Sequence, residues 1–172
     1  MMSFKDIKLN TEYRSGKSDV IKDFYIPVLS RAVKYKRAVG FFSSTALIQI
    51  AKGISEMVVN GGHIQLIASP RLSEEDILAI QKGYESREQV VTNAIMREFK
   101  EPTSYFESER LNMLATLIAV GKLDIKIAFT HGRNQLGIYH EKMGLVYDSD
   151  NNVIAFSGST NESETAFVDN YE

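Results

Sequence analysis

Apolar and polar residues recur along the chain with two different periods, which predict a succession of helices and strands. After Ser18, which we expect to cap a helix, apolar residues recur at helical spacing as far as Ala32. Pro27 lies inside this pattern and predicts a kink or a division into two short helices, because proline lacks a backbone donor. Residues 1–17 are mixed and polar, and we expect a loop or a short strand there.

A strand–helix–strand unit is expected next. Residues 35–42 predict a buried strand, and a helix capped by Ser43 and Ser44 should end at the C-cap signal over 60–62. Residues 63–68 predict the following strand. A unit of this length is typical of a βαβ crossover, in which the two strands lie parallel and the connection is right-handed.

Helical patterns dominate the middle of the chain, and strand patterns dominate its last third. Three helices are expected, over 73–84, 86–99 and 104–120. Three strands are expected after them, over 123–129, 136–147 and 153–156. The polar residues 148–152 predict a turn that joins the last two strands into a hairpin. The sequence therefore predicts one α/β domain over 1–172, with a mixed central β-sheet flanked by helices.

Composition restricts the kinds of site that the chain can carry. The 172 residues include 20 lysine and arginine against 22 aspartate and glutamate residues, so a site for a phosphate-bearing ligand must be a local basic pocket. The absence of cysteine excludes disulfides and thiolate metal sites. No apolar stretch approaches the roughly 18 residues of a membrane span. The sequence contains neither a His-Glu-x-x-His zinc motif nor a Gly-x-x-x-x-Gly-Lys-Ser/Thr loop for a nucleotide cofactor. We expect a cytoplasmic protein with no membrane partner.

The residues that indicate a chemistry are His140 and Lys142, followed by Gly158, Ser159 and Asn161. Residues two apart in a strand point to one face, so His140 and Lys142 should project together. Ser159 and Asn161 are also two apart, and the hairpin should bring both pairs to one edge of the sheet. Such a set suits a phosphate diester, because Lys142 offsets its charge while Ser159 and Asn161 donate hydrogen bonds to its non-bridging oxygens. His140 can then attack phosphorus.

The pattern His140-x-Lys142 with Gly158-Ser159-x-Asn161 resembles the signature of the phospholipase D superfamily. Most of the chain also resembles the phospholipase D-like domain at the N-terminus of some bacterial helicase-type proteins and in related nucleases. This resemblance implies a metal-independent phosphodiesterase that acts on nucleic acid, DNA in particular. One histidine would attack phosphorus to form a phosphohistidine, and a second histidine would protonate the leaving group.

The resemblance also bears on three residues near the motif. In nuclease members an acidic residue eleven positions after the motif asparagine orients the nucleophile, and that position here is Glu172. The full family motif places an aspartate five residues after the lysine, where this chain has Tyr147 and then Asp148. A slip of one residue in a strand moves a side chain to the opposite face. We therefore expect Asp148 to be a turn residue rather than a catalytic partner.

One copy of the motif is half of a two-histidine site, so the resemblance implies a single phospholipase D-like half-unit. A homodimer with sites that meet across a two-fold axis would complete it, or a further part of the protein would supply the second half. The chain ends on a strand-like run at Glu172. We therefore expect the N-terminal fragment of a longer protein with a C-terminal helicase-type region.

Two other interpretations assign the domain little or no catalytic activity. The domain could be a catalytically weak or inactive nucleic-acid-binding or targeting module of a helicase or restriction-type protein. It could also be a scaffold that dimerises through the same edge. Lys36 and Arg37 are interpreted as surface charges, with phosphate steering as the alternative, and His63 is interpreted as structural.

Overall fold

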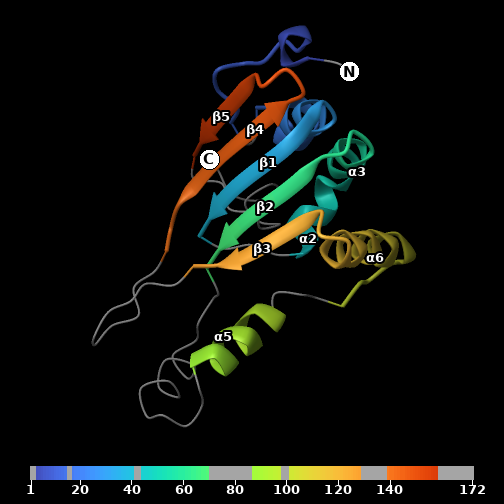
Figure 1. The fold of residues 1–172 in the computed structure, drawn as a ribbon, viewed down its shortest axis with the longest axis vertical. Helices are drawn as coiled ribbons and strands as arrows, with labels where there is room; N and C mark the ends of the chain where they lie inside the picture. The colour runs from blue at the N-terminus through green and yellow to red at the C-terminus, as the bar shows by residue number, and fades with distance from the viewer. Residues whose placement is uncertain are drawn as a thin grey trace.

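A five-stranded β-sheet forms the centre of the fold, with its strands in the spatial order β3-β2-β1-β4-β5 (Figure 1). The computed structural model describes residues 3–14, 17–40, 44–69, 87–97, 101–128 and 139–158. The strands are β1 (Ala32–Val39), β2 (His63–Ala68), β3 (Leu123–Ile127), β4 (Lys142–Asp148) and β5 (Val153–Ser157). β1, β2 and β3 are parallel, whereas β4 is antiparallel to β1 and β5 is antiparallel to β4. This mixed sheet confirms the predicted α/β class.

Helices connect the strands, and α1, α2, α3 and α6 lie on one side of the sheet (Figure 1). The N-terminal part contains the 3-10 turn η1 (Phe4–Asp6), the π-helical turn η2 (Ile21–Tyr25) and α1 (Ile26–Leu29). Between β1 and β2 lie α2 (Ser44–Gln49) and α3 (Ala51–Val59), and between β2 and β3 lie α5 (Arg87–Met96) and α6 (Tyr105–Ala119). Over the described ranges, no helix has the length and apolar character that crossing a membrane requires.

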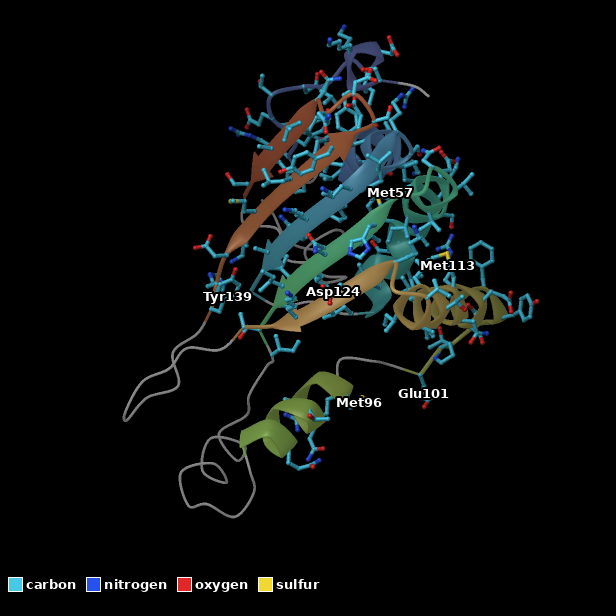
Figure 2. The ribbon with its side chains drawn as sticks, in the orientation of Figure 1. Met57, Met96, Glu101, Met113, Asp124 and Tyr139 are labelled. Atoms are coloured by element: carbon cyan, nitrogen blue, oxygen red, sulfur yellow. The ribbon has the colours of Figure 1, made fainter. Side chains whose placement is uncertain are left out.

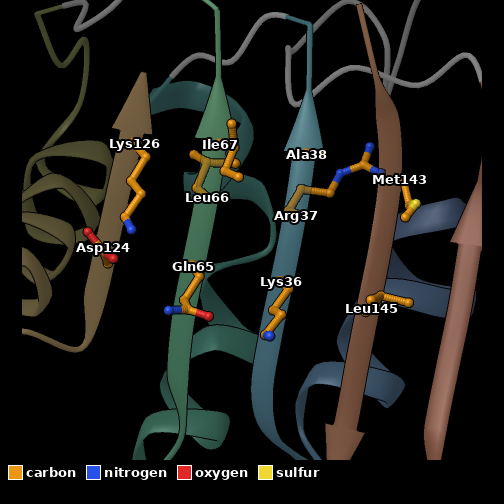
Figure 3. A pocket seen from close by; sticks show the side chains of 10 residues that line it. All are labelled: Lys36, Arg37, Ala38, Gln65, Leu66, Ile67, Asp124, Lys126, Met143 and Leu145. Carbon is orange, nitrogen blue, oxygen red and sulfur yellow. The ribbon is translucent and has the colours of Figure 1, made fainter. Parts of the chain in front are cut away.

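The hydrophobic core lies between the sheet and these helices. Tyr35 and Val39 of β1 are buried, whereas Lys34 and Lys36, which alternate with them, are exposed. This alternation is typical of a sheet that is covered on one face. The helices contribute buried apolar side chains to the covered face, among them Phe24, Val28, Leu29, Ile54, Met57 and Leu117. The opposite face carries a mixture of polar and apolar side chains, among them Lys36, Gln65, Asp124, Lys126, Ala38, Ile67, Met143 and Leu145 (Figure 3).

The βαβ unit forms where it was predicted, although β1 begins three residues before the predicted strand 35–42 and ends at Val39. β2 spans the predicted residues 63–68 and pairs in parallel with β1. Gly61 has a φ of +81°, a backbone conformation that suits glycine, and it ends α3 as the sequence indicated. The helix before it is divided at Ile50, which separates α2 from α3.

The first helix is shorter than predicted and has a different cap. The hydroxyl of Ser18 accepts from the backbone N–H of Arg14 and donates to its carbonyl, so the prediction of Ser18 as the cap is wrong. The carboxylate of Asp19 accepts from the backbone N–H of Lys22 instead. The helix ends at Leu29 because the following residues pair with β4 from Ala32 onward.

The later elements follow the sequence with small shifts of their ends. α5 and α6 fall inside the predicted helices 86–99 and 104–120, while the predicted helix 73–84 lies outside the described residues. Ser104 caps α6 by accepting from the N–H of Glu107 at 3.2 Å. β4 and β5 form the predicted hairpin. The pattern of turn residues therefore located the hairpin correctly.

Candidate active site

The motif residues His140 and Lys142 lie where β4 begins. Lys142 is the first residue of β4 and is paired with Val39, the last residue of β1. Ligands of open α/β sheets bind outside the carboxyl ends of the parallel strands, and Lys142 lies at that end of β1. Tyr139, which directly precedes His140, lies at the same end of the sheet (Figure 2).

The prediction of one strand over 136–147 is wrong around His140. Residues 139–141 are irregular, so His140 precedes β4 instead of lying in it. The pairing explains the difference, because the ladder between β4 and β1 begins at Lys142 opposite Val39. A period of two in the sequence indicates a strand, but it cannot show where the neighbouring strand stops supplying hydrogen bonds.

His140 and Lys142 nevertheless lie together, as their spacing predicted. The Nζ of Lys142 lies 2.8 Å from both Nδ1 and Nε2 of His140. An ammonium group only donates hydrogen bonds, and the tautomer of His140 determines which ring nitrogen accepts one. The imidazole is exposed and the lysine is half-buried. An exposed imidazole beside a cation can attack, through a ring nitrogen that carries a lone pair, a phosphate whose negative charge the cation offsets.

The second part of the predicted site is described only as far as Gly158. The backbone N–H of Gly158 donates to the carbonyl of Lys142 at 3.3 Å, which extends the pairing of β4 and β5 by one residue. The start of the Gly-Ser-x-Asn segment therefore lies beside the motif lysine. Ser159, Asn161 and Glu172 lie outside the described residues, so their roles stay predictions.

Arg37 is buried, and the interpretation of this residue as a surface charge is wrong. Its side chain is 3% exposed, and it shares the covered face of β1 with Tyr35 and Val39. Lys36 is exposed on the other face, as predicted. The Arg37 side chain extends from β1 toward β4 (Figure 3), and its guanidinium lies 5.0 Å from the ring centroid of Phe156. The alternation along β1 was the signal that could have identified Arg37 as inward-facing.

Gly144 provides the space in which the Phe156 ring lies next to Arg37. The register pairs Gly144 with both Arg37 and Phe156. A Cβ atom at Gly144 would clash with the Phe156 ring, so a side chain at this position would displace the ring. Gly144 is two residues from Lys142 in β4, so both positions belong to the same face of the sheet. The buried guanidinium and its aromatic neighbour therefore adjoin the motif lysine.

Asp148 lies at the other end of β4 and has a structural role. Its carboxylate accepts hydrogen bonds from the backbone N–H groups of Phe4, Asp150 and Asn152, and from the side chains of Ser3 and Asn152. Burial raises the pKa of this carboxyl, but the hydrogen bonds outweigh burial and lower the pKa to about 2. Asp148 is six positions from Lys142 along the strand, a distance of about 20 Å. Asp148 is the last residue of β4, so the prediction that it is a turn residue is wrong, although its carboxylate accepts hydrogen bonds from the turn that follows.

The remaining polar residues form no evident metal centre in the part of the chain that the structure describes. No group of three or more histidine, aspartate or glutamate side chains there could hold a metal ion. His63, at the start of β2, pairs with Lys34 at the opposite end of β1 from Val39. No protein-family model matches the chain, and no curated protein matches it.

Proposed function

We propose that this domain is a phosphodiesterase of the phospholipase D type, which cleaves nucleic acid, DNA in particular, in the cytoplasm and without a metal ion. The observation that carries the proposal is the contact between the Nζ of Lys142 and the His140 ring, at 2.8 Å. This pair lies at the carboxyl end of the parallel strands, where α/β sheets bind ligands. The adjoining Gly158 backbone supports the proposal, because it introduces the segment with the predicted phosphate donors.

The proposed reaction has two steps. A lone pair of the His140 imidazole attacks phosphorus, the N–P bond forms, and the bond from phosphorus to the leaving oxygen breaks with its electron pair. A second histidine gives a proton to that oxygen, and it later removes a proton from the water that hydrolyses the phosphohistidine. Lys142 stabilises the charge on the non-bridging oxygens in both steps. Ser159 and Asn161 would add hydrogen bonds, and Glu172 would orient His140.

The motif in this chain contains one histidine, so the second histidine of the proposed reaction has to come from elsewhere. A homodimer with a two-fold axis would place a second His140 opposite the first, and a helicase-type region of a longer protein is the alternative source. Light scattering tests the dimer directly. A dimer is expected to have twice the 19.4 kDa mass of the chain, whereas a strict monomer would leave half of the proposed site.

The decisive experiment is a cleavage assay on labelled DNA in the presence of a chelator. His140→Ala is expected to lower the cleavage rate at least about a thousandfold, because it removes the nucleophile. His63→Ala is the matched control, since this histidine lies in β2 at the far end of the strand from the motif, and it should cleave like the wild type. The wild type should also become covalently labelled by DNA, and His140→Ala should not.

Two results would contradict the proposal. Equal cleavage by the wild type and His140→Ala would exclude His140 as the nucleophile. DNA binding without any cleavage or covalent adduct would favour a non-catalytic binding module instead.

A further inference from the structure

A cleft of about 720 Å³ lies beside the candidate active site, between β5 and the N-terminal segment 9–14. This segment runs next to β5 in Figure 1. Phe24 and Tyr25 of η2 and the buried Arg37 also line the cleft. Gly158 lines it as well, and the N–H of this residue is bonded to the carbonyl of Lys142. The cleft therefore adjoins the place where a phosphate would be bound.

Aromatic rings and a cation make up the wall of this cleft. The ring centroid of Tyr13 lies 5.2 Å from that of Phe24, and the centroid of Phe24 lies 5.0 Å from that of Phe156. The guanidinium of Arg37 lies 5.0 Å from the Phe156 ring. Phe24 is buried, but Tyr13 and Phe156 are half-buried and leave part of each ring open. The rings are inclined to one another, by 51° between Tyr13 and Phe24 and by 78° between Phe24 and Phe156. Their open parts therefore form an apolar wall of separate ring surfaces beside the Arg37 guanidinium.

The rim of the cleft is polar and can recognise hydrogen-bonding groups. Asn10, Thr11, Glu12 and Arg14 lie on it, and the last two form an ion pair. A volume of this size falls within the range of about 300–1,000 Å³ that is usual for small-molecule pockets. A flat aromatic ligand with polar edges matches this combination better than an aliphatic chain does, because it can stack on one of the open rings and bond to the rim.

We propose that the cleft binds a nucleobase adjacent to the phosphate held at Lys142, and that it thereby selects single-stranded over duplex nucleic acid. The inference rests on the proposed function, because it takes the nucleotide substrate from there. Stacking on aromatic side chains accepts any base, so the cleft would favour single strands without reading a sequence. A duplex would have to unpair and unstack the base before it could enter the cleft.

The test compares three labelled probes on the full chain, with a chelator present and by fluorescence anisotropy. They are a single-stranded oligonucleotide, the same strand with abasic sites in place of its bases, and the matching duplex. The intact single strand should bind about five- to a hundredfold more tightly than the abasic strand. It should also bind more tightly than the duplex.

Variants of Tyr13 locate the effect in the cleft. Tyr13→Ala removes the ring and should abolish the preference for the intact strand, whereas Tyr13→Phe keeps the ring and should preserve it. The Tyr13 hydroxyl accepts from the N–H of Asn10 at 3.0 Å, so Tyr13→Phe also measures what that bond contributes. Tyr105→Ala is the matched control, since Tyr105 is 80% exposed on α6. Circular dichroism verifies that each variant folds, and the abasic comparison on the wild type requires no variant.

Equal binding of the intact and abasic strands by the wild type would overturn the inference, and so would equal loss of affinity in Tyr13→Ala and Tyr105→Ala. The two proposals fail separately. A preference for intact single strands without any cleavage would support the base cleft and refute the phosphodiesterase. Cleavage of intact and abasic strands at equal rates would support the phosphodiesterase and refute the base cleft.

Discussion

Replacing Asp148 by asparagine is expected to destabilise the protein strongly and to change its response to acid. Asp148 is 1% exposed, and its carboxylate accepts hydrogen bonds from two groups of donors. One group comes from Ser3 and Phe4 at the start of η1, and the other comes from the β4–β5 turn. An asparagine of the same shape would direct an NH₂ group at one set of these donors. The NH₂ group and the donors that it faces would then be buried without acceptors. The hydrogen bonds that hold the N-terminal segment to the hairpin would be lost on that side, and this contact would weaken.

The size of the effect follows from the pKa of Asp148. The folded protein holds this pKa at about 2, below the ordinary value of 3.8, which corresponds to about 2 kcal/mol of stability from the ionised carboxylate. Because the folded pKa is the lower one, this stability is fully present above pH 4 and is lost as the pH falls toward 2. Asp148→Asn carries no such charge, so it should be about 2 kcal/mol less stable than the wild type at pH 7.

Urea unfolding followed by circular dichroism measures this difference at pH 7, 5, 3 and 2. The gap between wild type and Asp148→Asn should shrink as the pH falls from 4 to 2. Asp150→Asn is the matched control, because Asp150 is an exposed aspartate in the same turn and its change should cost less than about 0.5 kcal/mol. Equal stabilities of the two variants at pH 7, or a gap that does not change with pH, would refute this explanation of Asp148.

Three further predictions concern other parts of the fold and the site. Gly144→Ala should lower the free energy of unfolding by about 1–3 kcal/mol in urea titrations, because its methyl group would displace the Phe156 ring; an unchanged midpoint would contradict the packing. Lys142→Met should reduce DNA cleavage at least about a hundredfold without a change in melting temperature, whereas Lys36→Met, on the opposite face, should leave cleavage intact. Ser104→Ala should cost about 1 kcal/mol in thermal unfolding, since it removes the cap of α6, and a smaller loss would mean that water replaces the cap.

Local patterns in the sequence predicted most of the sheet. β2 and the hairpin were predicted because their alternation and turn residues are local signals, and the end of α3 was predicted from Gly61. The start of β4 was not, because it depends on where β1 ends, and β1 is about a hundred residues earlier in the chain. A strand boundary that a distant strand determines leaves no trace in its own segment.

The environment of Arg37 shows the same limit for the site. An arginine in a strand is usually exposed, so its charge favoured the surface interpretation. Its burial depends on Phe156, whose ring lies over Gly144, and both residues come from the distant hairpin. The close contact of His140 and Lys142 was predictable because two residues of spacing determine it. Contacts between residues a few positions apart could therefore be predicted from the sequence. The contact between Arg37 and Phe156, which line the neighbouring cleft, could not.

One end of β4 contributes to the stability of the fold, and the other end carries the residues of the proposed chemistry. At one end Asp148 binds the N-terminal segment and the hairpin turn, and at the other end Lys142 contacts His140. The strand between them is about 20 Å long and is paired on both sides, so it is a rigid connection. Tyr147 occupies the position at which the phospholipase D motif places its aspartate, and it lies under the Nζ of Lys34 at 5.6 Å. Neither Tyr147 nor Asp148 can reach His140 from there. Any carboxylate that orients the histidine must therefore come from outside β4, as the prediction for Glu172 requires.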